Sequence, residues 1–225
     1  MEWLKARDIV GVLELSPGVR SLQVRYNNGQ ISLARLLDVL IIAEQKLGVL
    51  ENQILESRVI KLPIALDDPW SKRAIERYQK SVCKEAPYLP CNLEFIARMN
   101  GLDSKQQVLD TICQAQYMVL GLGDVYLGAP CAVPLDPRHR LLTSKYNPAR
   151  TYTPEGSVGL GGAYMCIYGM ESPGGYQLVG RTIPIWDKYV QNPNSKDGKP
   201  WLLRFFDRVQ FYPVSADELV ELRRR

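Results

Sequence analysis

One stretch constrains the fold of this chain more than any other: residues 121–187, which hold most of its 17 glycines and many of its 15 prolines. A long helix is excluded there, because each Gly or Pro in a helix interior costs about 1 or about 3 kcal/mol, respectively. We therefore predict short strands joined by shaped loops. Loops supported by a rigid frame are where binding and catalytic side chains usually lie, so this stretch is also the first place to look for a site.

Composition sets the size and class of the protein. The chain has 225 residues, of which 46% are apolar and 23% charged, so it can form one large domain or two small ones. The net charge of +4 is mild, whereas a nucleic-acid-binding protein normally shows a concentrated basic face. We predict no nucleic-acid partner. The densest basic cluster, Arg223–Arg225, is typical of a solvated helix end.

Membrane and metal functions are not expected either. No apolar run approaches the roughly 18 residues of a membrane span, and the best one, Leu36–Ala43, contains Asp38. The first residues are too charged for a secretory signal. The five cysteines include no Cys-x-x-Cys pair, and one histidine cannot complete a common zinc site. We expect a cytoplasmic protein with free thiols, no membrane partner and no metal.

Periodicity and turn residues predict the order of elements, and we divide the chain into a small α/β domain (1–65), a helical connector (66–115) and a β-rich half (116–225). For the first domain we expect a helix at 1–7, strands at 9–15 and 19–26, a helix at 32–48 and a strand at 59–65. For the β-rich half we expect strands at 117–121, 157–168 and 176–186, and either one strand or two short ones within 201–212. The fold class is α+β.

Capping signals place the helix starts of the connector and of the C-terminus. The run Asp67-Asp68-Pro69-Trp70 opens one helix, with Pro at an early helical position, and Asn92 can cap the next. Ser104-x-x-Gln107 and Ser215-x-x-Glu218 are capping-box patterns.

The glycine pairs do not form a nucleotide-binding motif. Gly159-Leu160-Gly161-Gly162 has Tyr164 where the dinucleotide fingerprint requires its last glycine, and no helix follows. We interpret these glycines as sites of strand bending and close backbone approach.

Three groups in the 121–187 stretch are candidates for a binding site. Arg138-His139-Arg140 can contact an anion, or His139 can be structural. Lys145–Arg150 combines a point charge, an amide and a bidentate guanidinium in one loop, which is either a site or an ordinary surface loop. Glu171–Tyr176 places a carboxylate and a hydroxyl before two glycines, so a ligand could approach the backbone closely; the alternative is a tight turn between strands.

The residues Tyr164–Thr182 resemble the signature of the allophanate hydrolase subunit 1 family. Within that family, three runs resemble the urea carboxylase and urea amidolyase branch, although the sequence departs from the variant that common members have. These runs are Gly121–Gly128, Asp136–Leu142 and Lys145–Arg150.

This resemblance implies a small α/β domain followed by a cyclophilin-like β-barrel domain. It also implies the C-terminal lobe of a carboxyltransferase domain, which moves a carboxyl group from carboxybiotin to urea or guanidine and gives allophanate or carboxyguanidine. The expected partners are a homologous companion lobe of the allophanate hydrolase subunit 2 type, a biotin carboxylase domain and a biotin carrier domain. Biotin is expected on the carrier, and ATP is expected to be used by a partner domain rather than bound here.

The resemblance also implies how the ends differ from relatives. These have a further strand before the helix expected at Met1, so we expect the first domain to lack its first strand, which would leave an exposed strand edge. They continue beyond the position of Arg225 to a biotin carrier. We expect the chain to be one piece of a larger enzyme and inactive alone.

Carboxyl transfer needs cations, hydrogen-bond donors and a place that excludes water, and we assign candidates on that basis. As catalytic residues we predict Lys145, Glu171 and Tyr126. As residues that bind substrate or biotin we predict Arg138, His139, Arg140, Tyr146, Asn147, Arg150, Ser172, Gly174, Gly175 and Tyr176. The apolar stretch 124–134 is predicted to face the companion lobe, or else to cover the core.

Two alternatives from the same family stay open. The chain could be a subunit of a bacterial 5-oxoprolinase, or a kinase-inhibitor type of binding module that turns over nothing.

Overall fold

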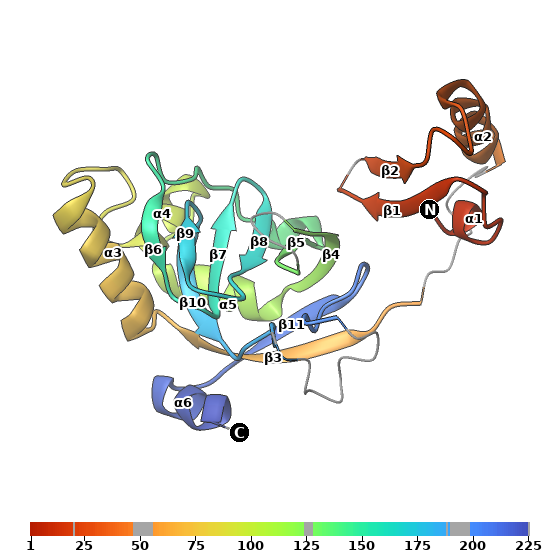
Figure 1. Ribbon diagram of the computed structural model, residues 1–225. Helices are drawn as coiled ribbons and strands as arrows, with labels where there is room; N and C mark the ends of the chain where they lie inside the picture. The colour runs from red at the N-terminus through yellow and green to blue at the C-terminus, as the bar shows by residue number, and fades with distance from the viewer. Residues whose placement is uncertain (20, 47–55, 124–127, 188, 190–198, 225) are drawn as a thin grey trace. The chain divides into compact units, whose positions relative to one another are not determined.

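The computed structural model describes residues 1–19, 21–46, 56–123, 128–187, 189 and 199–224 (Figure 1). The chain divides into two compact units, Met1–Glu56 and Ser57–Arg225. Each unit is described by itself below.

The first unit is a two-stranded antiparallel sheet with two helices. Its elements are α1 (Glu2–Lys5), β1 (Val12–Pro17), β2 (Leu22–Tyr26) and α2 (Leu33–Lys46). The predicted helix, strand, strand and helix are therefore present; three have shorter bounds, and β1 is shifted to begin three residues later and end two residues later than expected. The predicted apolar face of α2 is only partly buried within this unit: Leu36 is 3% exposed, but Leu33 and Ile41 are 56% and 52% exposed.

The second unit is a closed barrel of seven strands, in the order β10-β3-β11-β4-β5-β8-β7. Its strands are β3 (Val59–Leu66), β4 (Gln116–Leu122), β5 (Pro130–Pro134), β7 (Ser157–Gly161), β8 (Tyr164–Ile167), β10 (Gln177–Thr182) and β11 (Arg208–Pro213). A separate two-stranded sheet joins β6 (Arg150–Thr153) and β9 (Ser172–Gly174). The described strands thus confirm the predicted α+β class with a barrel domain.

Strand β3 differs from the sequence interpretation in its neighbours. We grouped the strand at 59–65 with the first domain, but β3 pairs in parallel with β11 and antiparallel with β10, inside the barrel. These partners lie more than a hundred positions away in the sequence, so local periodicity could not reveal them. Asp207, 2% exposed, fastens the beginning of β3 further, because it accepts hydrogen bonds from Arg58 at 2.8 and 2.5 Å.

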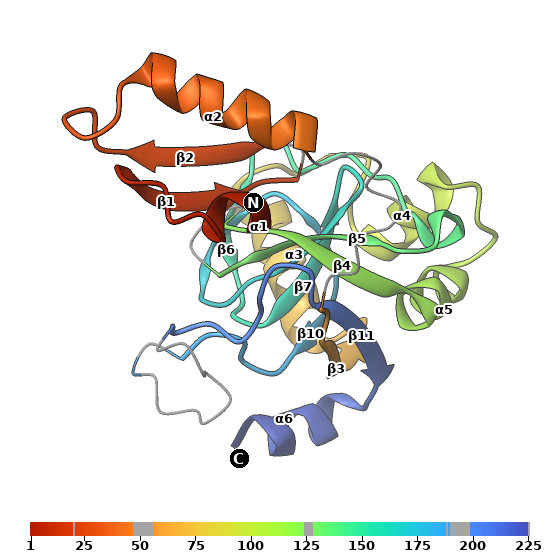
Figure 2. The same ribbon diagram turned by 90° about the vertical axis from the view of Figure 1, so that its right-hand side faces the viewer.

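Helices cover part of the outside of the barrel (Figures 1 and 2). They are α3 (Pro69–Ser81), α4 (Asn92–Met99), α5 (Lys105–Gln114) and α6 (Ala216–Arg224). Helix α3 packs on β6 and β10, α4 on α5 and β10, α5 on β11, and α6 on β3. Because β10 has helices outside and the barrel core inside, all of its residues except Arg181 are buried.

The helix starts confirm the two capping-box predictions, and α3 begins at Pro69 as expected. The Asp68 carboxylate accepts from Trp70 N and Ser71 N, each at 2.9 Å. Ser215 and Glu218 form a full capping box, with bonds of 2.7 and 3.1 Å. The Ser104 hydroxyl accepts from Gln107 N at 3.4 Å.

The prediction for Asn92 was wrong. Cys91 is the N-cap residue of α4, and its side chain makes no capping hydrogen bond. The Asn92 side chain has other partners, which are described below.

Two predictions for the β-rich half need correction. The single strand expected at 157–168 is a hairpin, because Gly162 with φ of +63° turns the chain between β7 and β8. The strand expected within 201–212 begins only at Arg208, as β11.

The stretch 124–134, expected to face a partner or else to cover the core, alternates in burial where it is described: Ala129 and Ala132 are 0% exposed, whereas Cys131 and Val133 are partly exposed. The positions 124–127 lie outside the described residues.

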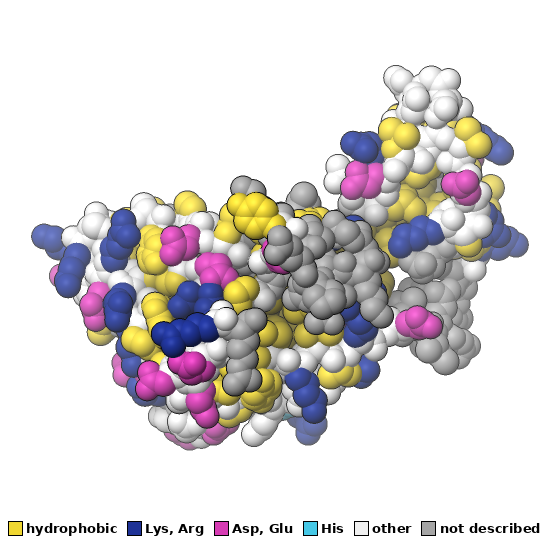
Figure 3. Space-filling view, turned by 60° about the horizontal axis from the view of Figure 1, so that its bottom comes forward, with side chains coloured by type: hydrophobic (Ala, Val, Ile, Leu, Met, Phe, Trp, Pro, Cys, Tyr) yellow, Lys and Arg dark blue, Asp and Glu magenta, His cyan; other side chains and the backbone are white. Residues whose placement is uncertain are grey.

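Charged side chains of both signs are interspersed on the face of the second unit that Figure 3 shows. One ion-pair group joins α6 to the barrel, since Glu155 accepts from Arg223 and lies 3.7 Å from Arg181. Among the helices that the structure describes, none combines the length and the apolar character needed to cross a bilayer.

Candidate functional site

The barrel brings together two of the three predicted groups. Tyr146 N donates to Gly175 O at 2.6 Å, and Arg150 pairs with Gly174 where β6 meets β9. The loop that begins at Lys145 and the turn that ends at Tyr176 therefore form one continuous structure. We call the two segments 145–150 and 171–176 together the paired loops.

Arg150 lies inside the paired loops rather than on their surface. It is 1% exposed, and its guanidinium donates to Tyr176 O at 2.7 Å and to Thr153 Oγ1 at 3.3 Å. Its Cζ also lies 4.4 Å from the centre of the Tyr146 ring. A buried guanidinium needs such partners, because desolvating a charge is costly. Arg150 thus contacts both segments and fixes one against the other.

Tyr146 packs against a cluster of aromatic rings. It is 5% exposed and lies 4.8 Å from the ring of Tyr78 and 4.1 Å from that of Tyr88. Its hydroxyl exchanges hydrogen bonds with the amide of Asn92 at 2.7 and 3.1 Å. Burial raises the pKa of Tyr146, while the nearby Arg150 opposes that shift. The hydroxyl therefore keeps its proton at neutral pH and can both donate and accept.

Lys145 and Asn147 present the polar groups of the first segment to solvent. Both are exposed. The Lys145 ammonium lies 4.6 Å from the centre of the Tyr176 ring, a cation–π distance. The Asn147 backbone is fixed, since its N–H donates to the Tyr88 hydroxyl at 3.1 Å. The segment therefore presents exposed polar side chains from a backbone that is held in place.

Glu171 lies at the other end of β9. It is exposed, and its carboxylate accepts from the Tyr152 hydroxyl at 3.1 Å. Burial, and then this hydrogen bond, raise the pKa of Tyr152. Ser172, the next residue, has a buried hydroxyl oxygen with no hydrogen-bond partner. These groups form a second polar end of the paired loops, away from Lys145.

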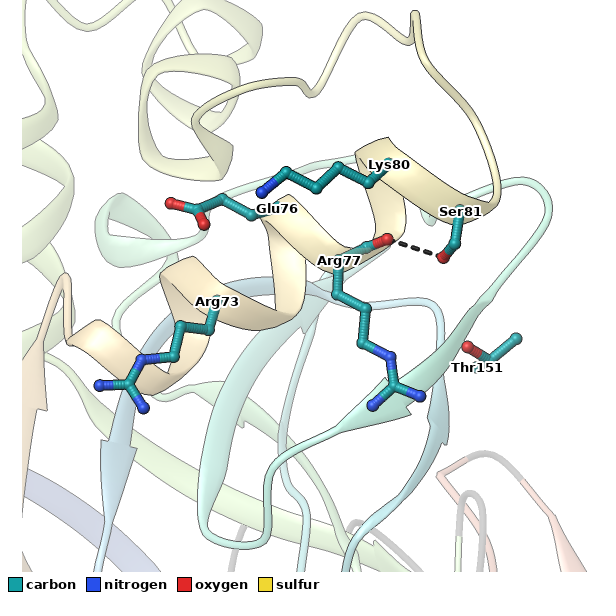
Figure 4. A pocket seen from close by; sticks show the side chains of 6 residues that line it. All are labelled: Arg73, Glu76, Arg77, Lys80, Ser81 and Thr151. Carbon is teal, nitrogen blue, oxygen red and sulfur yellow. Dashed lines mark hydrogen bonds between the residues drawn. The ribbon is translucent and has the colours of Figure 1, made fainter.

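A groove beside this end was not predicted (Figure 4). It has a volume of about 410 Å³ and is lined by Arg73, Glu76, Arg77, Lys80, Ser81 and Thr151. Arg77 links the groove to the Glu171 end of the paired loops. The Arg77 Cζ lies 5.0 Å from the centre of the Tyr152 ring, and the Tyr152 hydroxyl donates to Glu171. The sequence offered a signal, since positions 73, 77 and 80 share one helix face.

The third predicted group, Arg138–Arg140, is not joined to the paired loops by any hydrogen bond or ion pair recorded among the described residues. Arg138 has 88% of its side chain exposed and pairs with Asp136 at 2.6 Å. That hydrogen bond lowers the pKa of Asp136 to about 2. The expected anion contact of Arg138 is thus met by a carboxylate two residues away. His139 is half-buried and Arg140 exposed.

Tyr126 lies outside the described residues, so its predicted catalytic role stays a prediction. In the part of the chain that is described, no three His, Cys, Asp or Glu side chains gather in a way that could hold a metal ion.

Gly174 and Gly175 differ sharply in the space around them, and this gives a matched pair of substitutions. A Cβ on Gly174 would lie 2.6 Å from Cε1 of Tyr168 and would also overlap its hydroxyl. A Cβ on Gly175 would meet nothing closer than 3.6 Å.

We expect Gly174→Ala to lower the free energy of unfolding by about 1 to 3 kcal/mol through overpacking. Gly175→Ala should change it by less than about 0.5 kcal/mol, as for a residue without strain. Thermal unfolding of both variants measures this. Equal melting temperatures for the two would show that Gly174 is not packed as described.

Proteins of similar sequence and structure point to the same family as the motifs do. Residues 1–195 match the family described as carboxyltransferase domain, subdomain C and D. The urea amidolyase of Lachancea kluyveri is 53% identical over 210 residues, which cover 93% of this chain and 11% of that protein. A crystal structure of the Kluyveromyces lactis urea carboxylase aligns with a TM-score of 0.88 at 47% identity, over 99% of this chain and 20% of that one.

A more distant relative bears on the alternative function. A 5-oxoprolinase subunit of Bacillus subtilis is 30% identical over 159 residues, 69% of this chain and 59% of that protein. Both the identity and the coverage of this chain are lower than for the two yeast proteins.

The chain thus spans only 11% of the length of the urea amidolyase and 20% of the urea carboxylase that it matches. The family predicted from the motifs is confirmed. The chain belongs to the carboxyltransferase domain family, subdomains C and D, and is homologous to the carboxyltransferase region of urea amidolyases and urea carboxylases.

Proposed function

We propose that this chain is one lobe of the carboxyltransferase of a biotin-dependent urea carboxylase. In this role it would help move a carboxyl group from carboxybiotin to urea, or to guanidine, giving allophanate or carboxyguanidine. The observation that supports this most is the construction of the paired loops: the exposed Lys145 and Asn147 stand on a frame fixed by the buried Arg150, with Gly175 open beside them.

The paired loops fit a bound carboxylate and a ureido group. Lys145 supplies a positive charge, and the flat face of Tyr176 lies under it. Gly175 leaves room for close approach, whereas the Ser172 hydroxyl oxygen is buried at the Glu171 end. Biotin, held on a carrier domain, would supply the carboxyl group.

The residues would share the chemistry as follows. A bond forms between a urea nitrogen and the carboxyl carbon while the carboxyl bond to the ureido nitrogen breaks, and one proton passes from urea to that ureido nitrogen. Lys145 holds the carboxylate and offsets its charge. The Asn147 amide can donate to a urea or ureido oxygen. Tyr146 and Arg150, through their own hydrogen bonds, hold the segment that bears Lys145 and Asn147 in place.

Glu171 is proposed as an acceptor for substrate N–H groups. Four residue-to-residue steps of extended chain lead from it to Gly175, a distance of about 13 Å. Each side chain is held at its own end, Lys145 over Tyr176 and Glu171 by Tyr152. A single urea molecule is therefore held by one end at a time, and we place the carboxylate at the Lys145 end.

The remaining parts of the reaction are proposed to come from elsewhere. A companion lobe would complete the site, a biotin carboxylase domain would use ATP, and a carrier domain would bring biotin. The small share of the urea amidolyase that the chain spans leaves room for all of these. We also propose a cytoplasmic location.

A substrate panel tests the proposal. In the assembled enzyme, with the chain joined to these partner domains, we expect urea or guanidine to accelerate bicarbonate-dependent ATP cleavage and to become carboxylated. The 5-oxoprolinase alternative instead predicts turnover of 5-oxoproline. Turnover of 5-oxoproline without carboxylation of urea or guanidine would overturn the proposal, and binding of a histidine kinase without turnover would favour the binding-module alternative.

A further inference from the structure

The amide of Asn92 connects three segments that are far apart in the sequence. Asn92 is 1% exposed. Its Nδ2 donates to Tyr88 O at 3.0 Å and to the Tyr146 hydroxyl at 2.7 Å. Its Oδ1 accepts from the Tyr146 hydroxyl at 3.1 Å and from Leu178 N at 2.9 Å.

These contacts use the full hydrogen-bonding capacity of the side chain. A carboxamide has two N–H donors and one oxygen with two lone pairs, and all four are engaged here. A fully satisfied polar group in a buried place fixes its partners in one arrangement, because any shift leaves a donor or acceptor unpaired. Helix capping does not explain the residue, since Cys91 is the N-cap of α4.

The partners of Asn92 lead to both halves of the paired loops. Tyr146 stands between Lys145 and Asn147, and its own N–H donates to Gly175 O. Leu178 follows Tyr176 by two residues, and the Tyr176 ring lies under the Lys145 ammonium. A displacement of the amide would therefore move both the lysine and the ring below it.

We propose that Asn92 is a positioning residue that sets the distance between the Lys145 ammonium and the rest of the reaction site. It does so without contact to substrate, through Tyr146 on one side and Leu178 on the other. This inference rests on the proposed function.

Another asparagine on the same helix provides a matched control. Asn100, at the C-terminal end of α4, also fixes a loop: its amide donates to Leu142 O at 2.9 Å and accepts from Leu142 N at 2.8 Å. It has no recorded bond to Tyr146 or Leu178, and Leu142 lies before the paired loops.

The test compares Asn92→Asp, Tyr146→Phe and Asn100→Ala in the assembled enzyme. Asn92→Asp keeps the size of the side chain but removes both N–H donors, and Tyr146→Phe removes one hydroxyl only. We expect both to lower kcat for carboxyl transfer about 10- to 100-fold, the scale of a misplacement near 1 Å. Asn92→Asp should leave bicarbonate-dependent ATP cleavage in the absence of urea unchanged. Asn100→Ala should keep the transfer rate even where it lowers the melting temperature.

A double variant separates positioning from general loss of stability. If Asn92 acts through Tyr146, Asn92→Asp combined with Tyr146→Phe should cost less than the product of the two single effects on kcat. The inference is overturned if Asn92→Asp and Tyr146→Phe transfer the carboxyl group as fast as Asn100→Ala, or if their effects multiply. A wild-type enzyme that carboxylates neither urea nor guanidine would instead overturn the proposed function, a separate result.

Discussion

Replacing Arg150 by methionine is expected to lower both the stability of the barrel unit and the rate of carboxyl transfer. The substitution leaves the buried Tyr176 carbonyl and the Thr153 hydroxyl without their charged donor. Hydrogen bonds to charged groups contribute about 1.5 to 3 kcal/mol each when a partner is removed. We expect the free energy of unfolding to fall by about 3 kcal/mol, measured by thermal unfolding.

Arg150→Lys decides whether the charge or the planar guanidinium matters. Lysine keeps the positive charge but cannot reproduce the two fixed donors or lie flat on the Tyr146 ring. We expect the lysine variant to lose carboxyl transfer nearly as severely as the methionine variant. Arg73→Met, an exposed arginine on α3, serves as the stability control and should change the free energy of unfolding by less than about 0.5 kcal/mol.

The opposite outcome would assign Arg150 to ligand binding. If Arg150→Lys keeps full activity and Arg150→Met keeps full stability while its KM rises, the guanidinium contacts the substrate or biotin. Arg150 would then not be a buried residue that fixes the two segments of the paired loops against each other.

Local signals in the sequence predicted local structure well. Asp68 and the Ser215–Glu218 pair mark the starts of α3 and α6 because a cap depends only on neighbouring residues. The glycines of the 121–187 stretch excluded a long helix, and the structure has short strands there. Gly162 was counted within one strand, although its left-handed φ makes the hairpin turn.

Long-range pairing could not be predicted in the same way. Nothing within the strand at 59–65 shows that its neighbours are β10 and β11, because both pair with it only after the chain has closed the barrel. The same holds for Arg150. Arginine is rarely fully buried, so a site on the surface was the natural interpretation, and its burial depends on a carbonyl 26 positions away.

The candidate site was predicted in part for a related reason. The runs 145–150 and 171–176 were recognised as separate motifs, and the backbone bond from Tyr146 to Gly175 joins them. Arg138 resembled them in composition but pairs with Asp136, two residues before it. Asn92 was recognised only as a cap, because its partners Tyr146 and Leu178 are 54 and 86 positions away.

The Lys145 end of the paired loops is proposed to hold the carboxyl group while it passes to urea. The most direct measurement is a single turnover with labelled bicarbonate. The assembled enzyme is loaded with ATP and label, freed of both, and then given urea or guanidine. Lys145→Ala is compared with wild type in both steps.

We expect both proteins to load label equally, because loading is proposed to take place on partner domains. Wild type should then pass the label to urea or guanidine, whereas Lys145→Ala should do so at least about 100-fold more slowly, the usual effect of removing one electrostatic contact to the reacting group. Equal rates of transfer for the two proteins, with equal loading, would contradict the account.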